Sequence, residues 1–175
     1  MSRKNKSLPL FRLLIVGFFA LLLGGCAASG TSKLIGQPAP ATRVTMLNDG
    51  SIVSLDRYLG AGKPLVIAFW ATTCTYSPRA MEALDRVAQK LKPQGVEFVA
   101  VSIDKADNEQ RLRDLIKYRQ LGDLTHTFSG NDVYDETFMA YKAGELPFFV
   151  VIDGHGIIVA AGDKVSVVED YFKLS

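Results

Sequence analysis

Cys74, in the middle of the chain, lies in a sequence context that would favour a reactive thiolate. Cys74 follows a short apolar run, Pro64 to Ala68, which is typical of a buried strand, and it precedes a helical pattern with apolar residues on one face. A strand, a tight turn and a helix in this order place the Cys74 sulfur at a helix N-terminus. Unpaired N–H groups and the helix dipole stabilise a thiolate there. Because the thiolate attacks disulfide sulfurs, we predict that Cys74 is a nucleophile.

The other cysteine, Cys26, ends a segment that is typical of protein export. Residues 1–12 include four basic side chains and no acid, and residues 13–23 are almost entirely apolar but too short to span a bilayer comfortably. Leu23-Gly24-Gly25-Cys26 resembles a bacterial lipobox. That resemblance implies that residues 1–25 are a lipoprotein signal peptide and that Cys26 becomes the lipidated (palmitate-bearing) N-terminus. An ordinary secretory signal, or an uncleaved anchor with Cys26 incidental, are the alternatives.

Removal of this segment changes the charge and the cysteine count. The whole chain has 20 basic and 18 acidic residues, and four of the basic ones lie in residues 1–25, so the remainder carries a net charge of −2. Nothing in this balance indicates a nucleic-acid-binding surface. With Cys26 lipidated, Cys74 is the sole thiol, and an internal disulfide is impossible. Cys74 is then reactive, paired with another molecule, or buried and inert.

The rest of the sequence divides into a tether and one domain. Residues 26–41 are rich in Ala, Ser, Gly and Pro and predict a flexible tether, and residues 42–175 predict the domain. Asn48-Asp49-Gly50 between two short strand patterns predicts a β-hairpin. The further expected elements are a helical turn at 55–59, strands at 65–69, 96–103, 148–153 and 157–161, and helices from Cys74 to about 91 and at 107–120, 132–141 and 165–174.

Three motifs in this order resemble one family. They are Phe69-Trp70-Ala71-Thr72-Thr73-Cys74, Val101-Ser102-Ile103-Asp104, and the run from Gly144 to Asp153 that contains Leu146-Pro147. Over roughly residues 35–175 the chain resembles the membrane-anchored thioredoxin-like reductases of the TlpA or redoxin type. The resemblance implies an α/β thioredoxin-like fold, in which helices flank a central mixed β-sheet and an N-terminal hairpin extends it.

The same resemblance implies a substrate groove beside Cys74. A cis peptide bond between Leu146 and Pro147 would set backbone groups next to the sulfur. We expect Thr75 and Tyr76 beside this groove, where Tyr76 either shapes substrate access above the sulfur or simply fills the turn. A trans proline that opens an edge strand is the alternative. Trp70 is expected beside the site, either in contact with substrate or as packing.

The departures from the family pattern bear on how the mixed disulfide formed at Cys74 would be released. Ser77 stands where the second, resolving cysteine is expected, Ala68 where thioredoxins carry a buried acid, and Phe148 where threonine is usual. A hydroxyl forms no stable bond to sulfur, but Ser77 can donate a hydrogen bond to Cys74 and lower its pKa. Release of a mixed disulfide would then need an external thiol, such as glutathione or a partner protein.

We therefore expect a thiol-disulfide oxidoreductase of the cell envelope that acts on protein thiols or disulfides through Cys74 and Ser77. The lipid on Cys26 would hold it at the periplasmic face of a membrane, and Ala27, which is not a retention aspartate, slightly favours the outer membrane. We expect no cofactor and no nucleic-acid partner. We also expect no metal site, because His126 and His155 are far apart in the sequence. The alternatives are a non-catalytic binding or chaperone lipoprotein and a glutathione-peroxidase-like thiol peroxidase.

Overall fold

The computed structural model describes residues 33–59 and 62–174. The predicted signal peptide and the predicted lipidation site at Cys26 lie outside these ranges and remain predictions. Within the described ranges, every helix is too short or too polar to cross a membrane.

A five-stranded mixed sheet forms the centre of the domain, with the strand order β5-β4-β3-β6-β7. The strands are β3 (Leu65–Trp70), β4 (Glu97–Ser102), β5 (Thr125–Phe128), β6 (Phe148–Ile152) and β7 (Ile158–Gly162). Strands β3, β4 and β5 are parallel, whereas β6 and β7 run antiparallel to their neighbours. All six residues of the central strand β3 are buried, as expected for a strand covered on both faces.

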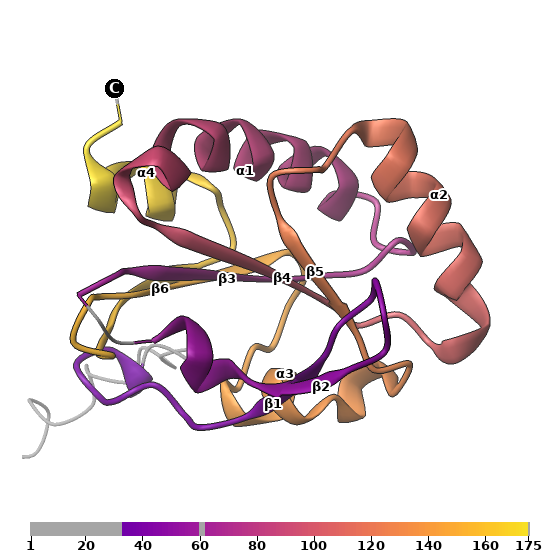
Figure 1. Ribbon diagram of the computed structural model, residues 1–175, viewed down its shortest axis with the longest axis horizontal. Coiled ribbons are helices and arrows are strands. Elements are labelled where there is room, and N and C mark those ends of the chain that lie inside the picture. The colour runs from indigo at the N-terminus through magenta and orange to yellow at the C-terminus, as the bar shows by residue number, and fades with distance from the viewer. Residues whose placement is uncertain (1–32, 60–61, 175) are drawn as a thin grey trace, which may run out of the picture.

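Two layers cover the sheet (Figure 1). Helices α1 (Ser77–Leu91), α2 (Glu109–Arg119) and α4 (Ser166–Phe172) lie on one face, and α3 (Glu136–Ala140) lies on the other with the hairpin of β1 (Arg43–Thr45) and β2 (Ile52–Ser54). The alternation of β3 builds both cores, because Val66, Ala68 and Trp70 point to the α1 side and the residues between them point to the hairpin side. The predicted α/β class, mixed central sheet and N-terminal hairpin are confirmed.

Strand β5 is the element that the sequence did not predict. Its residues, Thr125 to Phe128, form a short and largely polar run next to a turn, so the pattern contained no apolar signal. Two external contacts complete it: β5 pairs in parallel with β4, and the hairpin covers its outer edge, where Leu47 N–H donates to the His126 carbonyl at 3.0 Å. Pairing with β4 thus makes residues 125–128 a strand, although their own β-propensity does not predict one.

Three other boundaries differ from expectation. Helices α2 and α3 begin later than predicted, after 3₁₀ turns at Ala106–Asn108 and Asp132–Tyr134. Residues 36–39, assigned to the tether, follow the start of β7: Gly36 N–H donates to the Ile158 carbonyl at 2.8 Å and Ala39 N–H to the Gly156 carbonyl at 2.8 Å. The folded part therefore begins before residue 42, because these backbone groups find partners at the sheet edge.

Candidate active site at Cys74

The turn between β3 and α1 presents Cys74. The strand ends at Trp70 and the helix begins at Ser77, with Pro78 in its first turn, where the lack of an N–H costs no hydrogen bond. Cys74 N–H donates to the Ala71 carbonyl at 3.2 Å, which closes the turn. The Cys74 side chain is half-buried and forms no disulfide. The predicted placement of a sulfur just before a helix is therefore confirmed.

A buried carboxylate holds the start of this turn. Both oxygens of Asp104, two residues after the end of β4, accept hydrogen bonds from the Thr72 N–H, at 2.9 and 3.1 Å, and one also accepts from the Thr72 hydroxyl at 2.7 Å. The Ser102 hydroxyl donates to Asp104 at 2.8 Å, and Arg111 donates to the Thr72 carbonyl at 3.2 Å. Every polar group of this cluster has a partner, so it fixes the backbone two residues before Cys74.

The segment before β6 meets the sulfur from the other side. The peptide bond between Leu146 and Pro147 is cis, as predicted. The Cys74 thiol donates to the Leu146 carbonyl, with an Sγ–O distance of 3.3 Å. A residue pair 72 positions apart in sequence thus forms one site.

The surroundings of Cys74 favour its ionised form. Burial raises the pKa of the thiol, but hydrogen bonds from the Ser77 hydroxyl and from the N–H groups of Tyr76 and Ser77 outweigh burial, so the pKa lies below its ordinary value. Ser77 is fully buried, and among the described residues its hydroxyl has no partner of good geometry while the thiol keeps its proton. Ionisation of Cys74 gives this hydroxyl an acceptor, so Ser77 stabilises the thiolate.

An open groove of about 770 Å³ adjoins the turn. Of the residues predicted to contact substrate, Thr75, Tyr76, Leu146 and Pro147 line it together. Tyr76 is 76% exposed, which is unusual for an aromatic residue beside a reactive sulfur. The groove also contains residues that the sequence did not indicate: Arg79, Ala80, Ala83, Glu145 and the segment from Asp163 to Val165. These come from the exposed side of α1 and from the loop after β7, and their meeting depends on the tertiary fold.

Trp70 lies elsewhere, and the prediction that it contacts substrate is wrong for this structure. Its side chain is fully buried in the core under α1, because even-numbered positions of β3 point to that side. Its ring is 6.3 Å from the ring of His126 on β5, measured between centroids. The alternative reading, packing beside the site, describes it correctly.

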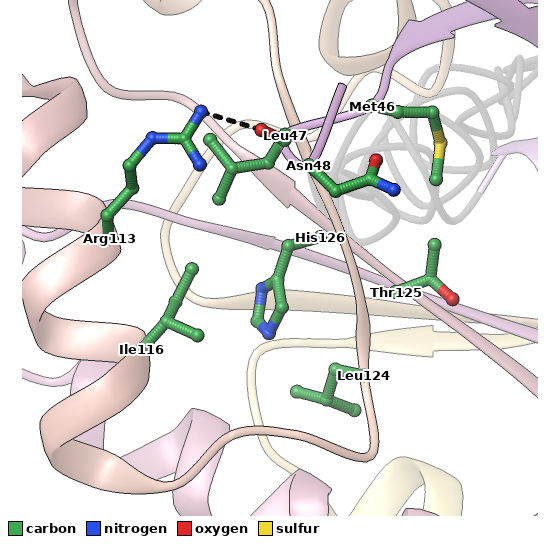
Figure 2. A pocket seen from close by; sticks show the side chains of 8 residues that line it. All are labelled: Met46, Leu47, Asn48, Arg113, Ile116, Leu124, Thr125 and His126. Carbon is green, nitrogen blue, oxygen red and sulfur yellow. Dashed lines mark hydrogen bonds between the residues drawn. The ribbon is translucent and has the colours of Figure 1, made fainter. Parts of the chain in front are cut away.

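A second pocket of about 440 Å³ lies between the hairpin, α2 and β5 and shares no lining residue with the groove. Figure 2 shows Arg113 donating to the Leu47 carbonyl at its edge, at 2.7 Å, with His126 among the lining residues. Within residues 33–59 and 62–174, His, Cys, Asp and Glu form no cluster of three suited to a metal ion.

Fold and site together define a thioredoxin-like protein, and the solved structures agree. The thioredoxin domain of a thiol-disulfide oxidoreductase from Bacteroides vulgatus superposes with a TM-score of 0.67 at 20% identity, covering 79% of this chain and 95% of that one. A solution structure of a thiol:disulfide interchange protein from Bacteroides sp. superposes with a TM-score of 0.63 at 24% identity, covering 79% and 90%.

The particular family follows from the sequence comparisons. Residues 35–161 match the AhpC/TSA family, to which the chain belongs. It is 32% identical over 162 residues to the thiol-disulfide oxidoreductase ResA of Bacillus thuringiensis (strain Al Hakam), covering 89% of this chain and 87% of that protein. It is 29% identical over 167 residues to the thiol:disulfide interchange protein DsbE of Escherichia coli (strain K12), covering 90% and 84%.

Proposed function

We propose that this protein is a thiol-disulfide oxidoreductase that uses Cys74 as its sole nucleophile and depends on an external thiol. The observation that carries the proposal is the setting of the Cys74 sulfur, which lies between the Leu146 carbonyl and the buried Ser77 hydroxyl at the edge of an open groove. Donors that favour the thiolate and a groove that admits a substrate are the two requirements of disulfide exchange. The relatives named above carry this activity in their names.

The reaction proceeds in three exchanges. The Cys74 thiolate attacks one sulfur of a target disulfide; the target S–S bond breaks, and a mixed disulfide with Cys74 forms while the other target sulfur leaves as a thiolate and takes a proton from water. An external thiolate then attacks the Cys74 sulfur and releases the rest of the target as a thiol. A second external thiolate regenerates Cys74, so that two external thiols are oxidised to one disulfide for each target disulfide reduced.

The residues around the sulfur have distinct roles in this proposal. Ser77 stabilises the thiolate, both as attacking and as leaving group, and cannot resolve the mixed disulfide. Thr75, Tyr76, Leu146 and Pro147 contact the target segment, which is a protein thiol or disulfide. Trp70 supports the turn from inside the core. We further propose, from the lipobox-like sequence alone, that lipid on Cys26 places the domain at the periplasmic face, with the outer membrane slightly favoured over the inner.

The decisive experiment follows reduction of a small mixed disulfide with glutathione as the external thiol. Wild-type protein should turn over, Cys74→Ser should not, and Ser77→Cys should release its mixed disulfide without added thiol. A stable mixed disulfide on wild-type Cys74 that glutathione cannot reduce would mean that the external thiol must come from a protein partner. Failure of native Cys74 to react with any disulfide would contradict the proposal.

A non-catalytic binding role is the second candidate, and the exposed Tyr76 on the groove is the observation that favours it. Such a module would retain peptides in the groove without covalent chemistry. Binding of unfolded, cysteine-free clients that is equal in wild type and Cys74→Ala, together with the absence of exchange, would establish this role instead.

A further inference from the structure

Four charged side chains line the groove beside Cys74. Two are basic and two are acidic: Arg79, Lys164, Glu145 and Asp163. All four residues are exposed, and within the described part of the chain none of them forms an ion pair or a side-chain hydrogen bond. One turn further along α1, by contrast, Glu82 forms an ion pair with Arg119 of α2. The groove therefore presents free charges of both signs.

The segment that carries two of these charges is fixed by the fold. Gly162 ends β7, and a Cβ atom at this position would lie 2.7 Å from the Val167 side chain, so the close turn into α4 needs a glycine. The Lys164 carbonyl accepts from Val167 N–H at 3.1 Å, and Val168 is fully buried in the core. The backbone of Asp163 and Lys164 is thus held in place before a ligand arrives, which lowers the cost of binding.

Charges of both signs beside a reactive sulfur restrict the chemistry of the ligand. A protein segment that reaches Cys74 has an uncharged backbone and side chains that differ between targets, so it offers no constant set of charges. A small thiol with its own carboxylate and ammonium groups offers both signs close to its sulfur. The groove volume of about 770 Å³ admits such a molecule, since small-molecule sites range over about 300–1,000 Å³. The charges and the volume together favour a small ligand.

We propose that this groove binds a small zwitterionic thiol, the chemical class to which glutathione belongs, and that this molecule is the external thiol of the proposed function. The two basic side chains attract its carboxylates, and the two acidic side chains attract its ammonium group. Apolar residues of the groove, among them Leu146, Pro147 and Val165, contact its uncharged frame. The inference rests on the proposed function, because it assigns a ligand to the same site.

The species that the groove stabilises is the mixed disulfide between Cys74 and the small thiol. It forms directly when the Cys74 thiolate attacks one sulfur of the small molecule's disulfide. The S–S bond of that disulfide breaks, the bond to Cys74 forms, and the second small molecule leaves as a thiolate that takes a proton from water. In turnover the same species forms in the second exchange, when the small thiol takes the place of the departing target.

The equilibrium constant for forming this mixed disulfide tests the proposal without turnover. The protein is mixed with the disulfide of glutathione, of glutathione diethyl ester, which lacks both negative charges, or of N-acetylglutathione, which lacks the positive charge. Mass spectrometry after acid quenching quantifies the adduct. Each variant is compared with wild type on all three disulfides, so a change in Cys74 itself affects the three constants equally and cancels in their ratios.

The expected losses depend on which charge the probe carries. Lys164→Gln and Arg79→Gln should each lower the constant for glutathione by about two- to fivefold and leave the constant for the diethyl ester unchanged, since exposed ion pairs are individually weak. Asp163→Asn should lower the constant for glutathione by a similar factor and leave that for N-acetylglutathione unchanged. Lys117→Gln and Asp107→Asn, which neutralise exposed charges outside the groove, should leave all three constants unchanged.

Two results would overturn the inference and leave the proposed function intact. One is an equal loss on all three disulfides in each groove variant, and the other is a wild-type constant for glutathione when all four groove charges are neutralised together. In both cases Cys74 still exchanges.

Failure of the proposed function has a different signature, because native Cys74 would then form no adduct with any of the three disulfides. S-methylglutathione, which carries the same charges but cannot exchange, tests the groove by itself in that case. It should shift the amide NMR signals of Asp163 and Lys164 in wild type and in Cys74→Ser alike. Unshifted signals would overturn the inference as well.

Discussion

The buried polar groups on the two sides of Cys74 are satisfied to different degrees. On the β4 side, Asp104, Thr72 and Ser102 hydrogen-bond to one another, and the cluster is complete in the resting protein. On the α1 side, the Ser77 hydroxyl is equally buried but has no good partner among the described residues until the thiol ionises. A cluster in which every polar group is paired stabilises the folded structure. A buried hydroxyl that lacks a partner favours instead the ionised form of the neighbouring Cys74 thiol, which can accept its hydrogen bond. The first therefore holds the turn, and we propose that the second serves the Cys74 thiolate.

Removal of the sulfur should have the largest effect. In Cys74→Ser we expect loss of all measurable exchange and alkylation, because no other thiol is available within the folded domain. Mass spectrometry after treatment with a labelled disulfide would detect any adduct. An adduct on the variant would show that Cys74 is not the reacting group, and unchanged thermal unfolding would show that the loss is chemical.

Breaking the complete cluster should cost stability next. Asp104→Ala leaves the Thr72 N–H and hydroxyl and the Ser102 hydroxyl unpaired in the interior, and we expect a loss of about 2–4 kcal/mol in the free energy of unfolding. Urea unfolding measures it. The matched control is Ser77→Ala, which removes a hydroxyl without a partner and should change stability by less than about 1 kcal/mol. Equal losses of unfolding free energy in Asp104→Ala and Ser77→Ala would mean that the two buried polar groups contribute equally to stability, contrary to the comparison above.

The incomplete side should instead appear in the pH profile of alkylation. The Ser77 hydroxyl lowers the pKa of Cys74, so Ser77→Ala should raise that pKa and move the profile to higher pH. At pH 7 less thiolate is then present, and the alkylation rate should fall by roughly 3–10-fold, since each pKa unit corresponds to about 1.4 kcal/mol. Ser77→Thr retains the hydroxyl, so its alkylation rate at pH 7 should lie between those of the wild type and Ser77→Ala. A profile that does not move would remove Ser77 from the chemistry.

The smallest effect is expected at the edge of the groove. Tyr76→Ala removes an exposed ring that touches neither cluster, so stability and the alkylation rate should stay within about twofold of wild type. Exchange with a disulfide-linked peptide should slow more than exchange with a small aromatic disulfide. A Tyr118→Ala control alters an equally exposed ring on α2. The same effect on both substrates would mean that Tyr76 does not contact the target segment.

The sequence predicted the elements whose signals are local. The apolar run of β3, the Asn48-Asp49-Gly50 turn and the cis bond at Pro147 each lie within one short stretch, and all three are confirmed. It did not predict β5, which depends on its neighbours, or the contact between Asp104 and Thr72, which joins the ends of two strands 32 residues apart. The side to which Trp70 points was predictable in principle, because alternation along β3 decides it, but only once the exact strand boundary is known.

The position of the N-terminal segment has a consequence for assembly. Residues 36–39 cover the beginning of the edge strand β7, and Met46 and Leu47 cover the opposite edge at β5. One continuous stretch of about a dozen residues therefore covers part of both edges of the sheet, where unpaired backbone groups would otherwise allow sheets to join. When two copies of the domain meet, these edges therefore offer fewer backbone groups for pairing strands between molecules, so the N-terminal segment disfavours aggregation through the sheet.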